Sequence, residues 1–150
     1  MLPIRKLVAG DAGRVKEFFG QMGGESRSFF NVNSWNEKKT MEFFDEEKRD
    51  KNAVYWIALD GDKMAGYVFL NDMNRGIPWL GIAVAEDWKG RGLGKALMEK
   101  AREHAISKGK GGILLTTHIA NIRGQALYSR CGYERLGIHT GGEVLFLLRF

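Results

Sequence analysis

Apolar side chains at helical spacing first appear directly after Asp11. They recur at i, i+3, i+4 and i+7, which places them on one face of a helix with Asp11 as its N-cap. The residues of this apolar face are Val15, Phe18, Phe19 and Met22. A short β-compatible segment, 4–8, precedes this helix. Ser34 with Glu37 forms a capping box, which predicts a second helix running to Phe44.

From residue 53 the pattern changes to that of strands. A β-rich run over 54–59 meets the turn Asp60-Gly61 and returns over 64–70, so a β-hairpin is expected. A third strand is predicted over 79–85 after a further turn.

A long amphipathic helix is predicted over 93–108, because apolar residues repeat every four positions and Gly109 follows the last turn. The residues of its apolar face are Leu93, Leu97, Ala101 and Ala105. The remaining predicted elements are a strand at 113–117, a helix at 121–130 and two strands at 133–138 and 144–150. The resulting order, βααβββαβαββ, predicts an α/β (α+β) fold with a mixed, mostly antiparallel sheet and helices on both faces.

Length and composition limit the possible classes. The 150 residues contain no linker or repeat, so one domain over 1–150 is expected. The net charge of +5 either slightly favours anionic ligands or only aids solubility. Nucleic-acid binding is not expected, because the sequence has no basic cluster interleaved with aromatic residues. Cys131 is the single cysteine and the three His are dispersed, so neither a disulfide nor a metal site is expected. No apolar run has the length of a signal or membrane span, so we expect a cytoplasmic protein without a membrane partner.

The segment with the clearest chemical signal lies between a predicted strand end and a helix start. It reads Lys89-Gly90-Arg91-Gly92-Leu93-Gly94-Lys95. Glycines let backbone N–H groups converge, and a helix N-terminus adds unpaired donors and a positive dipole, so phosphate oxygens are favoured ligands. The glycines are also compatible with a tight turn alone. Their spacing matches neither a Walker loop nor a dinucleotide-binding fingerprint.

Residues 89–94 resemble the acetyl-CoA pyrophosphate loop of the GNAT acetyltransferases, Gln/Arg-x-x-Gly-x-Gly/Ala, with Lys89 in place of Gln or Arg. A second segment, 121–133, is similar to the family's Asn-x-x-Ala-x-x-Leu-Tyr-x-x-x-Gly-Phe, with Gly124 for Ala and Tyr133 for Phe. The order of elements agrees with the family over nearly the whole chain.

The resemblance implies a GNAT fold whose sheet splays between the strands ending at Val84 and Thr117, with acetyl-CoA in the gap as acetyl donor. Backbone groups of the first strand would pair with the pantetheine arm, amides of the glycine turn would bind the pyrophosphate, and Asn121 would contact the pantetheine or the acceptor. The implied cofactor-binding residues are Ile82, Ala83, Val84, Lys89, Gly90, Arg91, Gly92, Leu93, Gly94, Lys95, Asn121 and Tyr128.

Tyr128 matches the family position that in many members protonates the departing CoA thiolate after direct attack by a neutral amine. A phenol of pKa near 10 and a thiol near 8.5 differ by about 2 kcal/mol, so donation is easy if the site slightly stabilises phenolate. Tyr128 is also consistent with a half-buried helix aromatic. The base that deprotonates the amine is left open: His118, directly or through water, is the first candidate. The weaker candidates are Glu25, Glu86, Asp72 and Glu143.

The resemblance also predicts where the acceptor lies, between the loop 20–33 and the turn 139–142. Phe29, Phe30 and Trp35 either line its pocket or pack on the core. A small-molecule amine is the expected acceptor, with a protein N-terminus or lysine as the alternative. A non-catalytic acyl-CoA-binding regulatory module is a further alternative. The apolar strand 144–150 is a candidate for pairing in a homodimer.

Overall fold

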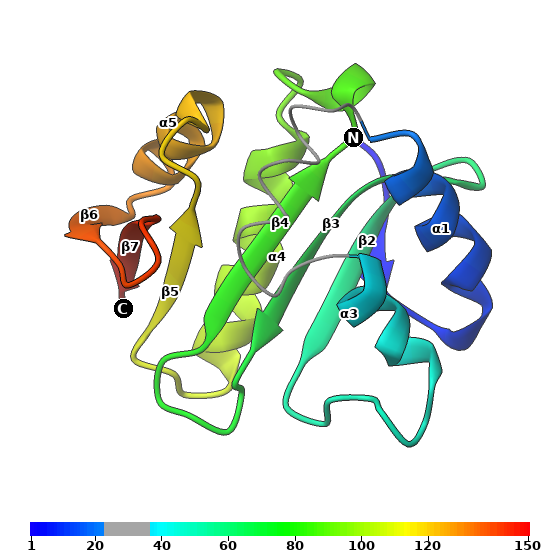
Figure 1. Cartoon of the computed structure of the whole chain (residues 1–150), viewed down its shortest axis with the longest axis horizontal. Coiled ribbons are helices and arrows are strands. Elements are labelled where there is room, and N and C mark those ends of the chain that lie inside the picture. The colour runs from blue at the N-terminus through cyan, green and yellow to red at the C-terminus, as the bar shows by residue number, and fades with distance from the viewer. Residues whose placement is uncertain (23–36) are drawn as a thin grey trace.

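The computed structural model describes residues 1–22 and 37–150. In these parts of the chain a seven-stranded sheet has the order β1-β2-β3-β4-β5-β7-β6 (Figure 1). The strands are β1 (Ile4–Lys6), β2 (Val54–Asp60), β3 (Lys63–Asn71), β4 (Trp79–Val84), β5 (Gly112–Thr117), β6 (Glu134–Ile138) and β7 (Val144–Arg149). The α-helices are α1 (Ala12–Gly20), α3 (Glu37–Met41), α4 (Leu93–Ser107) and α5 (Ile122–Arg130). Short 3-10 turns are η1 (Ala9–Asp11), η2 (Glu42–Phe44) and η3 (Glu86–Trp88).

The sheet is split in its middle. Neighbouring strands run antiparallel except β4 and β5, which are parallel. These two strands pair at Trp79 and Leu114, near their starts, and then diverge toward Val84 and Thr117 (Figure 1). The splay implied by the sequence resemblance is therefore present, and it opens a gap at the carboxyl ends of both strands.

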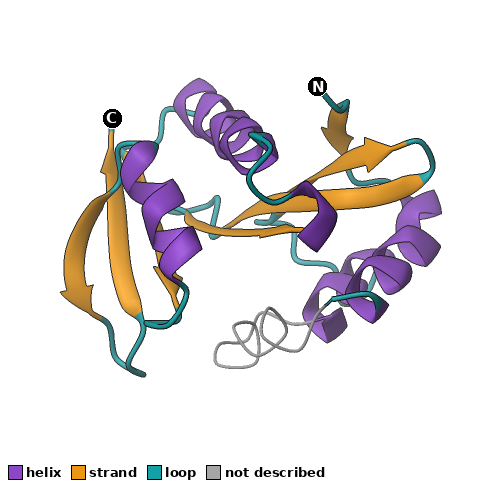
Figure 2. Cartoon of the chain, turned by 90° about the horizontal axis from the view of Figure 1, so that it is seen from above, coloured by secondary structure: helices purple, strands orange, loops and turns teal. Residues whose placement is uncertain are grey.

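Helices cover both faces of the sheet, as the element order predicted (Figure 2). On one face, α1 buries Val15, Phe18 and Phe19 against Tyr67 of β3. On the other face, the apolar stripe of α4 packs with α5 and the sheet in a second cluster of buried side chains. The two clusters lie on opposite sides of β2 and β3. Buried side chains therefore cover both faces of the half of the sheet that ends in β4.

The strand and helix boundaries agree with the predicted ranges to within a few residues, and the mixed α/β class is confirmed. The prediction for Asp11 is wrong in one respect: it precedes α1 but its side chain makes no capping bond. Its fully buried carboxylate instead accepts two 2.8 Å hydrogen bonds from Arg5, together with bonds from Arg14 and the Val8 amide. A buried carboxylate is satisfied better by two guanidinium groups than by one helix amide. Ser34 lies outside the described residues.

The predicted role of the last strand in a homodimer is also wrong, because β7 is not an edge strand. It pairs with β5 on one side and with β6 on the other. Its backbone N–H and C=O groups are therefore already used within the sheet, and β1 and β6 are the outer strands. Among the helices that the structure describes, none combines the length and the apolar character needed to cross a membrane.

Candidate active site

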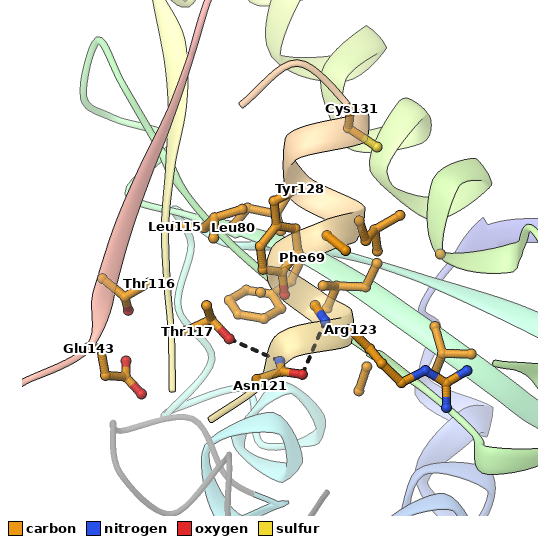
Figure 3. A pocket seen from close by; sticks show the side chains of 18 of the residues that line it. Phe69, Leu80, Leu115, Thr116, Thr117, Asn121, Arg123, Tyr128, Cys131 and Glu143 are labelled. Atoms are coloured by element: carbon orange, nitrogen blue, oxygen red, sulfur yellow. Dashed lines mark hydrogen bonds between the residues drawn. The ribbon is translucent and has the colours of Figure 1, made fainter. Parts of the chain in front are cut away.

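A cavity of about 1170 Å³ lies where β4 and β5 diverge (Figure 3). Its walls come from β4, the glycine turn before α4, the end of β5, helix α5 and the turn between β6 and β7. This volume exceeds that of a typical pocket for one drug-sized ligand, about 300–1,000 Å³. The site therefore has room for a large cofactor arm and a second reactant.

The glycine turn opens α4 toward this cavity. Gly90 and Gly92 have φ values of 74° and 85°, the left-handed region in which side chains are strained, and Gly92 is the N-cap. The first intrahelical bond runs from the Ala96 amide to the Gly92 carbonyl, so the amides of Gly92 through Lys95 have no partner within the helix. A Cβ on Gly94 would lie 2.9 Å from Leu127, so the glycine also allows α5 to approach α4 closely.

The cavity wall includes most of the residues that the resemblance assigned to the cofactor, all except Arg91 and Leu93. Leu93 is buried in the core and Arg91 lies with its guanidinium 3.9 Å from the centre of the Trp88 ring. Arg91 also donates a hydrogen bond of 3.1 Å to the Asp87 carbonyl. Only the backbone amides of these two residues are therefore in a position consistent with phosphate binding.

Arg123 is a candidate that sequence reasoning missed. It lies in the first turn of α5, yet a Cβ built on Gly90 would come within 3.5 Å of its Nη2 atom. Its side chain therefore spans from one wall of the cavity to the glycine turn on the other. The sequence signal that could have identified Arg123 is its position as a positively charged residue just after the N-cap of α5, the helix that follows β5. Lys89, Lys95 and Arg130 line the same cavity and add positive charge to its wall.

Tyr128 lies on α5 with only 6% of its surface exposed. Its ring packs edge-on against that of Phe146, with the two ring centroids 5.6 Å apart. Burial raises the pKa of Tyr128 to about 12, the Thr117 side chain opposes this shift, and the negative charge of Glu143 adds to it. The phenol is thus a weaker acid than the ordinary tyrosine assumed from the sequence. The gap to a thiol of pKa near 8.5 widens to about 5 kcal/mol.

Asn121 links the end of β5 to the start of α5 (Figure 3). Its Nδ2 donates a hydrogen bond of 2.9 Å to Thr117 Oγ1, and its Oδ1 accepts one of 3.1 Å from the Gly124 amide. Asn121 is therefore the N-cap of α5 and at the same time part of the cavity wall.

The structure separates the candidate bases. His118 is not on the cavity wall, and its Nδ1 accepts a 3.0 Å hydrogen bond from the Ala120 amide, so its position does not favour a role in proton transfer. Glu86 lines the cavity but pairs with Lys89 at 2.7 Å. Asp72 and Glu143 also line it, and Glu143 is only 4% exposed although it carries a carboxylate.

The remaining predicted site residues divide into two groups. Glu25, Phe29, Phe30 and Trp35 lie outside the described residues. His139 and Thr140, from the turn expected to border the acceptor, lie on the cavity wall. Cys131 lines the cavity as well, but burial raises the pKa of its thiol, which makes a nucleophilic role less favourable.

A splayed sheet, a glycine turn at a helix N-terminus and a buried tyrosine in the same cavity form the arrangement that the sequence resemblance implied. Residues 22–133 match the model of the acetyltransferase (GNAT) family, and the chain belongs to this family. Streptothricin acetyltransferase of Escherichia coli is 28% identical over 95 residues, which cover 63% of this chain and 54% of that protein. Matches to two other curated relatives cover 35% and 57% of their lengths, so the chain spans between about a third and somewhat more than half of these proteins.

Solved structures share the fold. The GNAT domain of S. lividans PAT superposes with a TM-score of 0.84 at 19% identity, covering 98% of this chain and 89% of that one. The PaiA N-acetyltransferase from Thermoplasma acidophilum, solved in complex with coenzyme A, gives a TM-score of 0.80 at 16% identity and covers 100% and 99% of the two chains. At these identities the likeness shows a common fold.

Proposed function

We propose that this protein transfers the acetyl group of acetyl-CoA to a primary amine of a small molecule by direct attack, with Tyr128 as the proton donor to the leaving sulfur. One observation carries the proposal: a single cavity joins the unpaired amides of the glycine turn to the buried hydroxyl of Tyr128. Acyl transfer from a CoA thioester requires a site that binds the anionic phosphates and a group that donates a proton to the leaving sulfur.

The residues present fit the cofactor. Acetyl-CoA supplies a thioester whose acetyl group is activated toward amines. The amides of Gly92 through Lys95 and the side chains of Lys89 and Arg123 would hold its phosphates, since each hydrogen bond to a charged oxygen contributes about 1.5–3 kcal/mol. The edge of β4 at Ile82 to Val84 lies beside the gap in the sheet, where backbone groups are available to an extended arm.

Tyr128 holds its proton throughout the range in which amines react. With a pKa of about 12 it is almost wholly protonated at neutral and mildly alkaline pH, as a general acid must be. Because the phenol is a weak acid here, proton transfer needs a donor that stabilises the phenolate as it forms. The Thr117 side chain, whose effect is to lower the pKa of Tyr128, would supply that stabilisation.

The acceptor end of the cavity differs in charge from the cofactor end. Asp50, Asp72 and Glu143 line the cavity, together with Lys39, and Glu143 lies across it from Arg123 (Figure 3). Carboxylates attract an amine in its ammonium form to this side, whereas Arg123 and its basic neighbours attract phosphates to the other. A positively charged acceptor is therefore favoured over a neutral or acidic one. The streptothricin acetyltransferase relative supports a small-molecule acceptor.

The test is an assay of free-thiol release from acetyl-CoA with polyamines, amino acids, aminoglycosides and short peptides, comparing the wild type with Tyr128→Phe. Release with one class of small amine, reduced about 100-fold or more in the variant, supports the proposal. Release with peptides alone shifts the acceptor to proteins. Binding of acetyl-CoA without release for any amine indicates a regulatory module, and absence of binding refutes the assignment.

A further inference from the structure

We propose that the ring of Phe69 limits the length of the acyl group that the cavity accepts, so that the protein uses acetyl-CoA and excludes donors with longer chains such as butyryl-CoA. The inference rests on the proposed function, because it concerns the donor of that reaction. It makes Phe69, a residue of β3 that lies outside both sequence motifs, a determinant of donor specificity.

The position of the acyl group follows from the shape of the gap between β4 and β5. The two strands pair at Trp79 and Leu114 and diverge from there, so the gap is closed at that end and open at Val84 (Figure 1). The glycine turn, where the phosphates would bind, follows the open end. An arm that starts at the turn and follows β4 past Val84 and Ile82 reaches Gly81 next. Its acyl end would therefore lie beside Gly81, where the gap narrows.

Phe69 forms the wall of the cavity at this point. Phe69 and Gly81 are direct partners in the antiparallel pairing of β3 and β4, so the two positions face the same side of the sheet. A Cβ built at Gly81 would overlap Cε1 and Cζ of the Phe69 ring, so the ring occupies the space over β4 that a side chain at 81 would fill. Phe69 lines the cavity, yet it is only 1% exposed (Figure 3). The ring therefore closes the cavity here.

Two tyrosines hold the Phe69 ring in place. Tyr55 of β2 stacks on it with the ring centroids 5.6 Å apart, and Tyr67 of β3 stacks on it at 6.2 Å. Tyr55 and Tyr67 are themselves buried, at 6% and 1% exposure. A close-packed interior does not make room for additional methylene groups without strain. A longer acyl chain would therefore meet a fixed obstacle at Phe69.

The strands on either side of the gap supply further apolar walls. Leu80 of β4 and Leu115 of β5 line the cavity and are buried. They belong to the cluster on the face of the sheet opposite to that of Phe69. Apolar side chains thus bound the narrow part of the gap on both faces, which suits a methyl group and opposes extension of the chain.

The first test measures binding and needs no turnover. Isothermal titration calorimetry compares CoA, acetyl-CoA and butyryl-CoA with the wild type and with Phe69→Leu. A methylene group in an apolar pocket changes recognition about 10- to 200-fold, so butyryl-CoA should bind the wild type at least about tenfold more weakly than acetyl-CoA. In Phe69→Leu this difference should shrink, with the Kd for CoA unchanged. A wild type that binds both thioesters equally well overturns the proposal, even if the variant does not fold.

The second test measures kcat/KM for acetyl-CoA and propionyl-CoA with one amine acceptor. Phe69→Leu should raise the ratio of propionyl-CoA to acetyl-CoA turnover about tenfold or more. Phe19→Leu is the matched control, because Phe19 is a buried phenylalanine of the same cluster that is not part of the described cavity wall. It should lower the Tm and leave the ratio unchanged. A ratio that shifts equally in both variants, or in neither, overturns the role of Phe69.

Failure of the proposed function gives a different result. In that case no acyl-CoA releases thiol with any amine, whereas the calorimetric comparison of acetyl-CoA with butyryl-CoA still decides whether Phe69 limits the acyl group.

Discussion

Arg123→Met provides a direct test of how the cavity binds phosphate. The substitution keeps a long, flexible side chain but removes the charge that lies next to Gly90. One hydrogen bond from a guanidinium to a phosphate contributes about 1.5–3 kcal/mol. The Arg123 side chain is exposed, so solvent screens it, and the lower end of this range applies. We expect the Kd for CoA to rise about tenfold, the equivalent of ~1.4 kcal/mol.

The assay is isothermal titration calorimetry with CoA and, separately, with pantetheine, which lacks the phosphates. Arg123→Met should weaken the binding of CoA and leave the binding of pantetheine unchanged, and its CoA affinity should depend less on salt. Arg102→Met serves as the control, because Arg102 is an exposed cation on α4 that is not part of the cavity wall. A Kd for CoA within twofold of the wild type, or an equal loss for pantetheine, would refute the reasoning.

Three further predictions concern the fold and the acceptor. Asp11→Asn should lower the free energy of unfolding by about 1–3 kcal/mol at pH 7. Hydrogen bonds from Arg5 hold the pKa of Asp11 in the folded protein below its usual value near 3.9. The difference in Tm between variant and wild type should therefore be complete above about pH 4 and shrink as the pH falls through the pKa of Asp11 in the folded protein. Gly81→Ala would overlap the ring of Phe69, which is fully buried, and should cost about 1–3 kcal/mol in chemical denaturation; an unchanged midpoint would contradict this. Glu143→Gln should raise KM about tenfold for acceptors with a second ammonium group and leave KM for single-charge amines unchanged; an equal fall in kcat for all amines would instead assign Glu143 as the base.

Much of the fold is local in origin and was predictable. The apolar stripe of α4 repeats every four residues, and its residues are all buried, because helical geometry alone brings them to one face. The two motifs occupy the turn before α4 and the helix α5, where strand, turn and helix follow one another in sequence. Such segments carry their structural signal within a dozen residues.

The errors and omissions involve contacts between different elements of the fold. The order of the last strands could not be read from their apolar pattern, because β7 inserts between β5 and β6 by pairing on both sides. Asp11 looked like a helix cap, yet its carboxylate accepts hydrogen bonds from Arg5 of β1, six residues earlier in the chain. In both cases the partner is decided by how elements pack, which no local pattern encodes.

The sequence by itself determined the class of this protein, since glycine spacing and the asparagine-to-tyrosine motif depend on local backbone geometry that short segments specify. Only the tertiary structure decided which side chains meet in the cavity: Arg123 at Gly90, Glu143 on the far wall, and Asn121 bonded to Thr117. It also decided that Tyr128 is a weaker acid than an exposed phenol, because burial raises its pKa to about 12. The physical reason is that contact and desolvation arise from the packing of distant segments.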